Sequence, residues 1–169
     1  MTLRLLGCAL VAAAGAFMGL RAAARLRKQL RVLDEIAEGL GLLEQELELH
    51  APELEELMCG LSDRTQGAAK QLFSSVGTSV IEGEGPVAEQ WGRSVSKVEE
   101  LIPDGKLCLY GLGEVLGRYD CREQRNCVAA VRRRLEHIRE AEGVLCRSRC
   151  RTCQTVGLSG GAFLIILLL

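Results

Sequence analysis

Uncharged, largely apolar stretches occupy both ends of the chain, whereas the residues between them mix apolar and charged positions in a helical rhythm. No charged residue occurs from Leu5 to Leu20 or from Gln154 to Leu169. A membrane-spanning helix needs about 20 predominantly apolar residues, within a range of about 17–25. Flanking residues can lengthen each segment, because long basic side chains reach the interface. The pattern therefore predicts two transmembrane helices, over residues 1–21 and 154–169.

Basic residues border both predicted membrane helices on the side that faces the middle of the chain. Five follow the first segment and three precede the second: Arg21, Arg25, Arg27, Lys28 and Arg31, then Arg147, Arg149 and Arg151. Because Lys and Arg at the ends of membrane helices favour the cytoplasmic side, both borders predict the same topology. Residues 22–153 are therefore expected in the cytoplasm, attached to the cell membrane at both ends.

The first segment has a second interpretation, as a cleaved signal peptide. Arg4 gives it a charged start, and Ala22, Ala23 and Ala24 offer small residues for cleavage. However, Arg21 lies inside that cleavage region and a basic run follows it, which is typical of a stop-transfer flank. We therefore favour a retained membrane helix.

Each apolar segment carries two glycines four residues apart, Gly15 and Gly19 in the first and Gly157 and Gly161 in the second. Both pairs lie near the predicted cytoplasmic end, so antiparallel helices would hold them at similar depth. Glycines at this spacing let helix backbones approach closely in lipid. We predict packing between the two helices, or between copies in a homo-oligomer; the alternative is that glycine is simply common in membrane helices.

The central part of the chain shows the spacing of amphipathic helices and no convincing period-two alternation. The first apolar stripe follows the basic run directly and recurs at steps of three and four: Leu26, Leu30, Leu33, Ala37, Leu40, Leu43 and Leu47. Gly39 and Gly41 interrupt this stripe, each at a cost of about 1 kcal/mol relative to Ala. They allow either close packing or a bend.

Five further helices follow from apolar spacing and from the residues at the helix ends. They are expected from Pro52 to Leu61, Ala68 to Ile81, Val87 to Val98, Pro103 to Leu116, and from Asp120 onward. Proline suits a first helical turn, and Gly117 suits a left-handed stop. Asp120 and Glu123 have the spacing of a capping box.

No helix breaker separates the last of these helices from the second apolar segment, so the two are expected to be continuous. In the fifth helix the apolar face is expected to include Leu107 and Tyr110. The predicted fold class is all-α: a cytoplasmic bundle of about six helices, flanked by N- and C-terminal transmembrane helices.

Charge is unevenly distributed along the central part. Val32 to Asp63 holds ten Asp or Glu residues and no Lys or Arg, whereas Arg118 to Arg151 holds ten arginines and five acids. We favour mutual pairing between the acidic first hairpin and the basic last helix, because charge runs usually form solvated or paired faces. The alternative is two surfaces for partners, with these candidate residues: Glu53, Glu55, Glu56, Arg132, Arg133 and Arg134. A net charge of −1 gives no argument for nucleic-acid binding.

Three cysteines raise the question of a metal or thiol site. Cys146, Cys150 and Cys153 are spaced C-x3-C-x2-C, which resembles the iron–sulfur motif of radical S-adenosylmethionine enzymes. That motif belongs on a loop near the start of an α/β barrel, whereas here it lies on a predicted helix near the C-terminus. A zinc site usually takes four ligands, and His137 is too far along the helix to complete one. A metal or thiol protein is therefore the minor alternative, and the remaining thiols are expected to be small buried apolar residues.

Catalytic signatures do not occur in the sequence. It contains no phosphate-binding G-x-x-x-x-G-K-[ST] loop and no dinucleotide-binding glycine fingerprint. His50 and His137 have no nearby nucleophile pattern and are expected to be exposed. We predict a non-enzymatic protein without catalytic, cofactor-binding or metal-binding residues.

Five segments, in this order along the chain, resemble those of the stage III sporulation protein AB family of endospore-forming bacteria. They are Leu42–Leu47 (LLEQEL), Pro52–Leu57 (PELEEL), Ala88–Trp91 (AEQW), Leu116–Gln124 (LGRYDCREQ) and Val156–Gly161 (VGLSGG). Two departures stand out: Tyr119 replaces a small hydroxyl residue, and Leu49–Leu54 replaces the family's usual YG-x-TPL turn. The resemblance spans the whole chain, and the combination of segments carries it.

The resemblance implies a role in spore formation, within the membrane channel complex that joins the mother cell to the engulfed forespore. It also implies a domain in the mother-cell cytoplasm that is similar to the helical domains of secretion-system platform proteins. The implied partners are the lipid bilayer, the cognate ATPase (stage III sporulation protein AA) and other channel components. A secretion-system platform unrelated to sporulation is the alternative.

Overall fold

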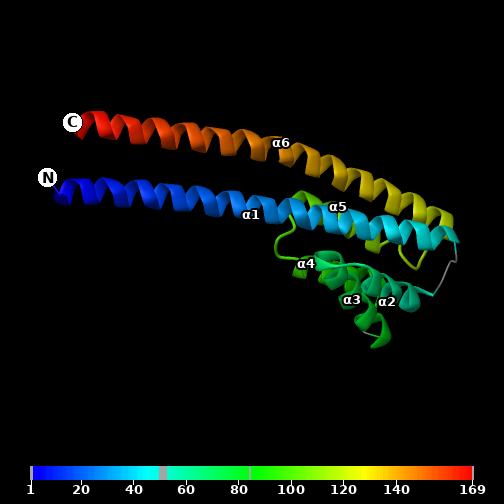
Figure 1. The fold of residues 1–169 in the computed structure, drawn as a ribbon. Helices are drawn as coiled ribbons and strands as arrows, with labels where there is room; N and C mark the ends of the chain where they lie inside the picture. Colours follow the sequence, from blue (N-terminus) through cyan, green and yellow to red (C-terminus); the bar gives the residue numbers. More distant parts are fainter. Residues whose placement is uncertain (1, 50–52, 84, 169) are drawn as a thin grey trace. The chain divides into compact units, whose positions relative to one another are not determined.

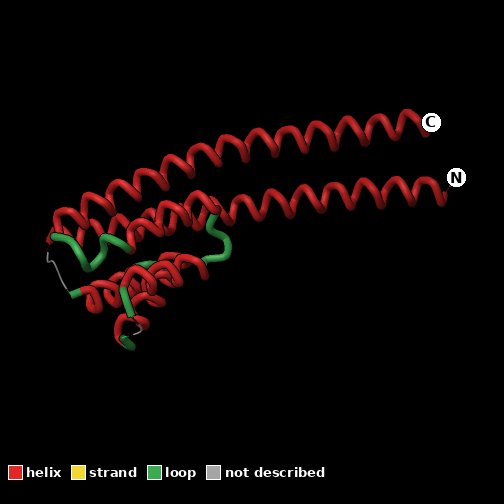
Figure 2. Tube along the Cα trace, turned by 180° about the vertical axis from the view of Figure 1, so that it is seen from behind, coloured by secondary structure: helices red, strands yellow, loops and turns green. Residues whose placement is uncertain are grey.

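The structure is a computed structural model that describes the backbone of residues 2–49, 53–83 and 85–168. Side chains are described for residues 17, 19–49, 53–83 and 85–145. The described backbone forms six helices and no strand, which confirms the predicted all-α helical bundle (Figure 1; Figure 2). The helices are α1 (Thr2–Leu49), α2 (Leu54–Arg64), α3 (Gly67–Ile81), α4 (Val87–Lys97), α5 (Pro103–Gly113) and α6 (Cys121–Leu168).

The first and last helices, α1 and α6, are each 48 residues long and unbroken. All three prolines of the chain (Pro52, Pro86 and Pro103) lie outside these two helices. Proline is the residue that most strongly interrupts a helix, whereas each interior glycine costs only about 1 kcal/mol. The predicted continuity of the last helix with the second apolar segment is therefore confirmed.

The chain divides into two compact units. One unit contains Met1–Lys28 and Ala141–Leu169, and the other spans Gln29–Glu140. Within the residues searched, which are those described, no helix combines the length and the apolar character that a membrane crossing needs. The predicted membrane segments, residues 1–21 and 154–169, lie outside the residues with described side chains except for residues 17 and 19–21.

The glycine pairs predicted to mediate helix packing also lie largely outside the residues with described side chains. Gly15, Gly157 and Gly161 lie outside the residues with described side chains. At Gly19, an added Cβ would meet no described atom within 4 Å.

The core of the second unit is formed by one face of α1 and by the short helices α2 to α5, with α6 contributing Val128 and Leu135. Trp91 of α4 is fully buried, and its Nε1 donates a hydrogen bond of 2.7 Å to the Leu109 carbonyl oxygen. Its ring centroid lies 6.5 Å from that of Phe73 in α3. The tryptophan thus links three short helices with one side chain.

Gly39 lets α1 approach α3 closely. A Cβ added at Gly39 would lie 2.8 Å from Cε2 of Phe73 and 2.9 Å from the Cβ of Ala69. Contacts this short do not occur between ordinary side chains, so a larger residue would push α1 away from α3. Of the two roles that the sequence left open for this glycine, the structure supports close packing.

The LGRYDCREQ segment forms the junction between α5 and α6, and the structure shows how its glycine and glutamine hold this loop. Helix α5 ends at Gly113, three residues before the predicted end, and Gly117 follows with φ +75°. The Gln124 side chain then holds the loop from α6: its Oε1 accepts from the Gly117 N–H at 3.3 Å, and its Nε2 donates to the Tyr119 carbonyl at 2.6 Å. The left-handed conformation predicted at Gly117 is confirmed, but the helix itself already ends at Gly113.

The start of α2 differs slightly from the prediction. Glu53 is the N-cap, and the helix begins at Leu54, while Pro52 lies outside the described residues. The start of α4 follows the expected loop, where Gly83 and Gly85 adopt φ values of +67° and +108°. Glycine has no Cβ and therefore adopts these values without strain.

A carboxylate from α1 caps the N-terminus of α3. Glu35 Oε2 accepts a hydrogen bond of 2.7 Å from the backbone N–H of Ala68. Gly67 has φ +58°, and an added Cβ there would overlap the Glu35 carboxylate. An acid at this position satisfies an otherwise unpaired N–H and favours the positive end of the helix dipole. Sequence spacing could not predict this cap, because the partners are 33 residues apart.

Glu35→Ala should lower the free energy of unfolding by about 1 kcal/mol, because it removes a helix cap without removing core volume. Urea denaturation followed by the fluorescence of Trp91, the single tryptophan, measures this change. Glu38→Ala is the matched control, since Glu38 is exposed on the same helix and has no partner among the described residues. Equal losses in the two variants would contradict the capping role.

Candidate functional site

Three ion pairs join α1 to α6 within the second unit. They are Arg125–Glu48 at 3.0 Å, Arg132–Glu44 at 3.2 Å and Arg139–Asp34 at 2.9 Å. The favoured prediction, mutual pairing of the acidic run with the basic last helix, is confirmed for these residues. The three arginines are seven residues apart, close to two helical turns, so they lie on one face of α6. That spacing was a signal in the sequence that could have identified the seam.

Arg132 is part of this seam rather than of a free surface. Its Nε lies 3.2 Å from Glu44 Oε2, and its Nη1 lies 2.7 Å from Glu136 Oε1. Its side chain passes over Gly41, where an added Cβ would lie 3.7 Å from the arginine Cδ. The geometry therefore gives Arg132 a structural role between the two long helices.

Arg133 and Arg134, the other two members of the predicted basic cluster, are exposed. Arg133 Nε donates to the Ala129 carbonyl at 3.2 Å, and neither residue forms an ion pair among the described residues. The structure thus separates the predicted cluster into one paired arginine and two exposed ones. The exposed pair can attract an acidic partner.

The predicted acidic surface lies at the start of α2. Glu53 is the N-cap and Glu55 and Glu56 lie in the first turn, all three exposed and without an ion-pair partner among the described residues. Elsewhere in the acidic run most carboxylates have internal partners, as Glu46 has in Arg64, whereas Glu38 and Asp63 are single exposed acids. The start of α2 is therefore where the exposed carboxylates of this run are concentrated.

An exposed apolar surface on α5 was not predicted. Leu107 is 73% exposed and Tyr110 is 41% exposed, although apolar spacing had placed both in the core. The buried face of α5 is instead Gly105, Leu109 and Leu112. An added Cβ at Gly105 would lie 2.9 Å from Leu101 and 3.2 Å from Leu33, so the helix packs closely at this glycine. The face of α5 that carries Gly105 is therefore turned to the core, and the face that carries Leu107 and Tyr110 is turned to solvent. The sequence-based assignment failed because glycine was not counted as a core residue.

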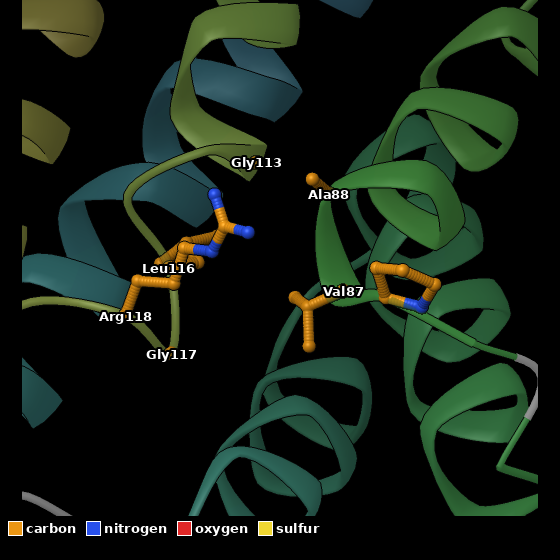
Figure 3. A pocket seen from close by; sticks show the side chains of 7 residues that line it. Val87, Ala88, Gly113, Leu116, Gly117 and Arg118 are labelled. Carbon is orange, nitrogen blue, oxygen red and sulfur yellow. The ribbon is translucent and has the colours of Figure 1, made fainter.

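A small pocket lies between the start of α4 and the turn after α5 (Figure 3). Its volume is about 200 Å³, and it is lined by Pro86, Val87, Ala88, Gly113, Leu116, Gly117 and Arg118. Val87 and Ala88 stand on one side, opposite Leu116 and Arg118 (Figure 3). Arg118 pairs with Glu114 at 3.3 Å. The lining offers room for an apolar side chain and no nucleophile or general base.

Some of the cysteines lie among the residues with described side chains and others lie outside them. Cys146, Cys150 and Cys153 lie outside the residues with described side chains, and no group of three metal-binding side chains occurs among the described residues. The expectation of buried thiols is wrong for Cys59, which is exposed, and Cys108, Cys121 and Cys127 are only half-buried. Burial raises the pKa of the Cys127 thiol, so it stays protonated and unreactive at neutral pH.

The histidines add no catalytic arrangement to this picture. His137 is exposed on α6, as predicted. His50 lies outside the described residues.

Comparison with known proteins gives one consistent result. A family model described as stage III sporulation protein AB matches residues 4–169. A solved structure of a stage III sporulation protein AB (SpoIIIAB) is similar, with 20% identity and a TM-score of 0.63, over 71% of this chain and 97% of that one. No curated protein matches the chain. At this identity the structural likeness supports the fold, and the family match supports the family.

Arg132→Glu should lower the free energy of unfolding by about 1 kcal/mol, because it places a third carboxylate beside Glu44 and Glu136. Adding Glu44→Arg should recover about half of the loss by restoring an opposite-charge pair. Arg133→Glu is the matched control and should change stability by less than about 0.5 kcal/mol. Urea denaturation measures all of these changes, and an equal effect of both reversals would contradict the seam.

Proposed function

Because the chain belongs to the stage III sporulation protein AB family, we propose that it is a non-enzymatic platform protein of endospore formation. In this proposal it is anchored in the mother-cell membrane by its two terminal segments, as part of the channel complex between mother cell and forespore. Its helical unit, Gln29–Glu140, lies in the cytoplasm and binds the cognate ATPase, a protein similar to stage III sporulation protein AA.

The observation that carries this proposal is the pairing of the two long helices. Helices α1 and α6 are the ones that continue toward the predicted anchors, and each is unbroken. They are also the helices that the three arginine–carboxylate pairs join. A force on the helical unit would therefore reach both predicted anchors along continuous helices, without passing through a loop.

Three surfaces of the helical unit are available for the ATPase. They are the exposed carboxylates at the start of α2, the exposed arginines Arg133 and Arg134, and the apolar surface of Leu107 and Tyr110 on α5. An exposed tyrosine such as Tyr110 has the character of an interface anchor, and Leu107 adds apolar area beside it on the same helix. Charged residues around them mainly affect the rate and specificity of association. We therefore propose that the α5 surface provides most of the binding energy.

Leu107→Asp with Tyr110→Ala should weaken binding of the cognate ATPase at least tenfold, because it removes two apolar anchors that the core does not need. Calorimetric titration of the full-length protein with the purified ATPase measures the affinity. Glu53→Lys, Glu55→Lys and Glu56→Lys together form one comparison, and Arg133→Glu with Arg134→Glu forms another. These charge reversals should change affinity less, and more strongly at low salt.

Arg132 is left unchanged in these variants because its reversal would disturb the seam between α1 and α6. A folded wild-type protein that does not bind the ATPase would contradict the proposed function. A loss confined to one charge-reversed surface would keep the function and move the binding site.

A further inference from the structure

The pocket between the start of α4 and the turn after α5 has room for about one side chain (Figure 3). Its volume of about 200 Å³ lies below the range of about 300–1,000 Å³ that is usual for small-molecule sites. An apolar cavity of about 150 Å³ is nonetheless large enough to bind benzene. The pocket can therefore hold one apolar group of the size of a leucine side chain, but not a larger ligand.

The walls of the pocket are apolar, and the space exists because some of the lining residues are small. Val87 of α4 stands opposite Leu116 of the turn (Figure 3). Ala88, Gly113 and Gly117 leave room between these two walls. The fold needs both glycines, because a Cβ at Gly113 would lie 2.9 Å from the buried indole ring of α4 and Gly117 has φ +75°. An apolar side chain that entered this space would therefore be covered on both sides.

The turn that forms one wall is held in place by hydrogen bonds. Within the turn, the Arg118 N–H donates to the Val115 carbonyl oxygen at 3.2 Å. From α6, Gln124 Oε1 accepts from the Gly117 N–H at 3.3 Å. A pocket that is formed before binding loses less conformational entropy when it is filled, so one side chain can bind measurably.

A cation stands at this pocket. Figure 3 shows the Arg118 side chain extending from the turn toward Ala88 on the opposite wall. No Asp or Glu lines the pocket. The guanidinium pairs with Glu114, one helical turn earlier, at 3.3 Å, and both side chains are 67% exposed. Because an ion pair this exposed contributes little, a carboxylate from a partner can share or replace it.

We propose that the pocket binds a segment of a partner protein in which a leucine-sized apolar side chain stands next to a carboxylate. The apolar group fills the space between α4 and the turn, and the carboxylate pairs with Arg118. A protein segment suits the site better than a free carboxylic acid, because the pocket covers only one side chain and Arg118 is largely exposed. The inference goes beyond the proposed function, since Leu107 and Tyr110 do not line the pocket.

The probe is the capped tripeptide acetyl-Asp-Leu-Asp-amide, which places a carboxylate on either side of a leucine. It is titrated into the full-length protein in phosphatidylcholine nanodiscs, and the NMR shifts of isotope-labelled Val87 methyl groups report binding. We expect a dissociation constant of about 1–10 mM. Acetyl-Asp-Ala-Asp-amide should bind at least tenfold more weakly, because it lacks most of the apolar group. Acetyl-Asn-Leu-Asn-amide should bind about threefold more weakly, which is the effect of one exposed ion pair.

Variants of the protein test the apolar and the charged half of the site separately. Ala88→Leu fills the pocket and should abolish binding of the Asp-Leu-Asp peptide. Arg118→Gln should weaken that binding about threefold and leave the Asn-Leu-Asn peptide unaffected, whereas Glu114→Gln removes the internal competitor and should strengthen it about twofold. Arg122→Gln is the matched control, because Arg122 is exposed and does not line the pocket, and it should leave the affinity unchanged.

Equal affinities for the Asp-Leu-Asp and Asn-Leu-Asn peptides would overturn the proposal, as would binding that survives in the Ala88→Leu protein. Isocaproate that binds as tightly as the peptide would assign the pocket to a free carboxylic acid instead. If Ala88→Leu does not fold, the opposite effects expected of Glu114→Gln and Arg118→Gln still decide, because both change exposed side chains. The titration contains no ATPase, so a failure of this site would leave the proposed function standing.

Discussion

The second unit depends on its part of α1, residues 29–49, forming one unbroken helix with two different faces. Its apolar face supplies six buried side chains to the core: Val32, Leu33, Ile36, Leu40, Leu43 and Leu47. Its acidic residues bind two other helices, since Glu35 caps the N-terminus of α3 and Glu44 pairs with Arg132 of α6. Gly39 sets the distance to α3. A bend in α1 would disturb the core, the cap and the seam together, which is why a helix without proline is essential here.

The seam between α1 and α6 determines geometry more than stability. Ion pairs at partly exposed positions contribute only about 0.2–1 kcal/mol each, while burial of a single leucine contributes about 2 kcal/mol. The three pairs nevertheless fix which faces of the two helices meet and in which register, since the arginines recur every seven residues on one face of α6. For a protein proposed to transmit force between a partner and a membrane, register matters more than the energy of any one pair.

Sequence periodicity predicted the elements well, because helix spacing and breakers are local properties. The six helices and the left-handed conformation of Gly117 follow from residues within one or two turns of one another. The Glu35 cap and the orientation of α5 did not follow, since they depend on contacts between distant segments. Gly105 shows the difference: in the sequence it looks like a weak point, and in the structure it is where α5 meets Leu33 of α1. The exposure of Leu107 and Tyr110 is a consequence of that contact.

The distribution of unpaired charge connects the proposed surfaces. Within the helical unit, α6 neutralises much of the acidic run of α1, so the exposed carboxylates that remain are concentrated at the start of α2. On the amino-terminal part of α1 basic residues predominate instead, since no Asp or Glu occurs before Asp34. Unpaired charge persists at a cost to a compact fold and is retained where a partner can neutralise it. The exposed carboxylates at the start of α2 therefore suit a partner with a basic surface.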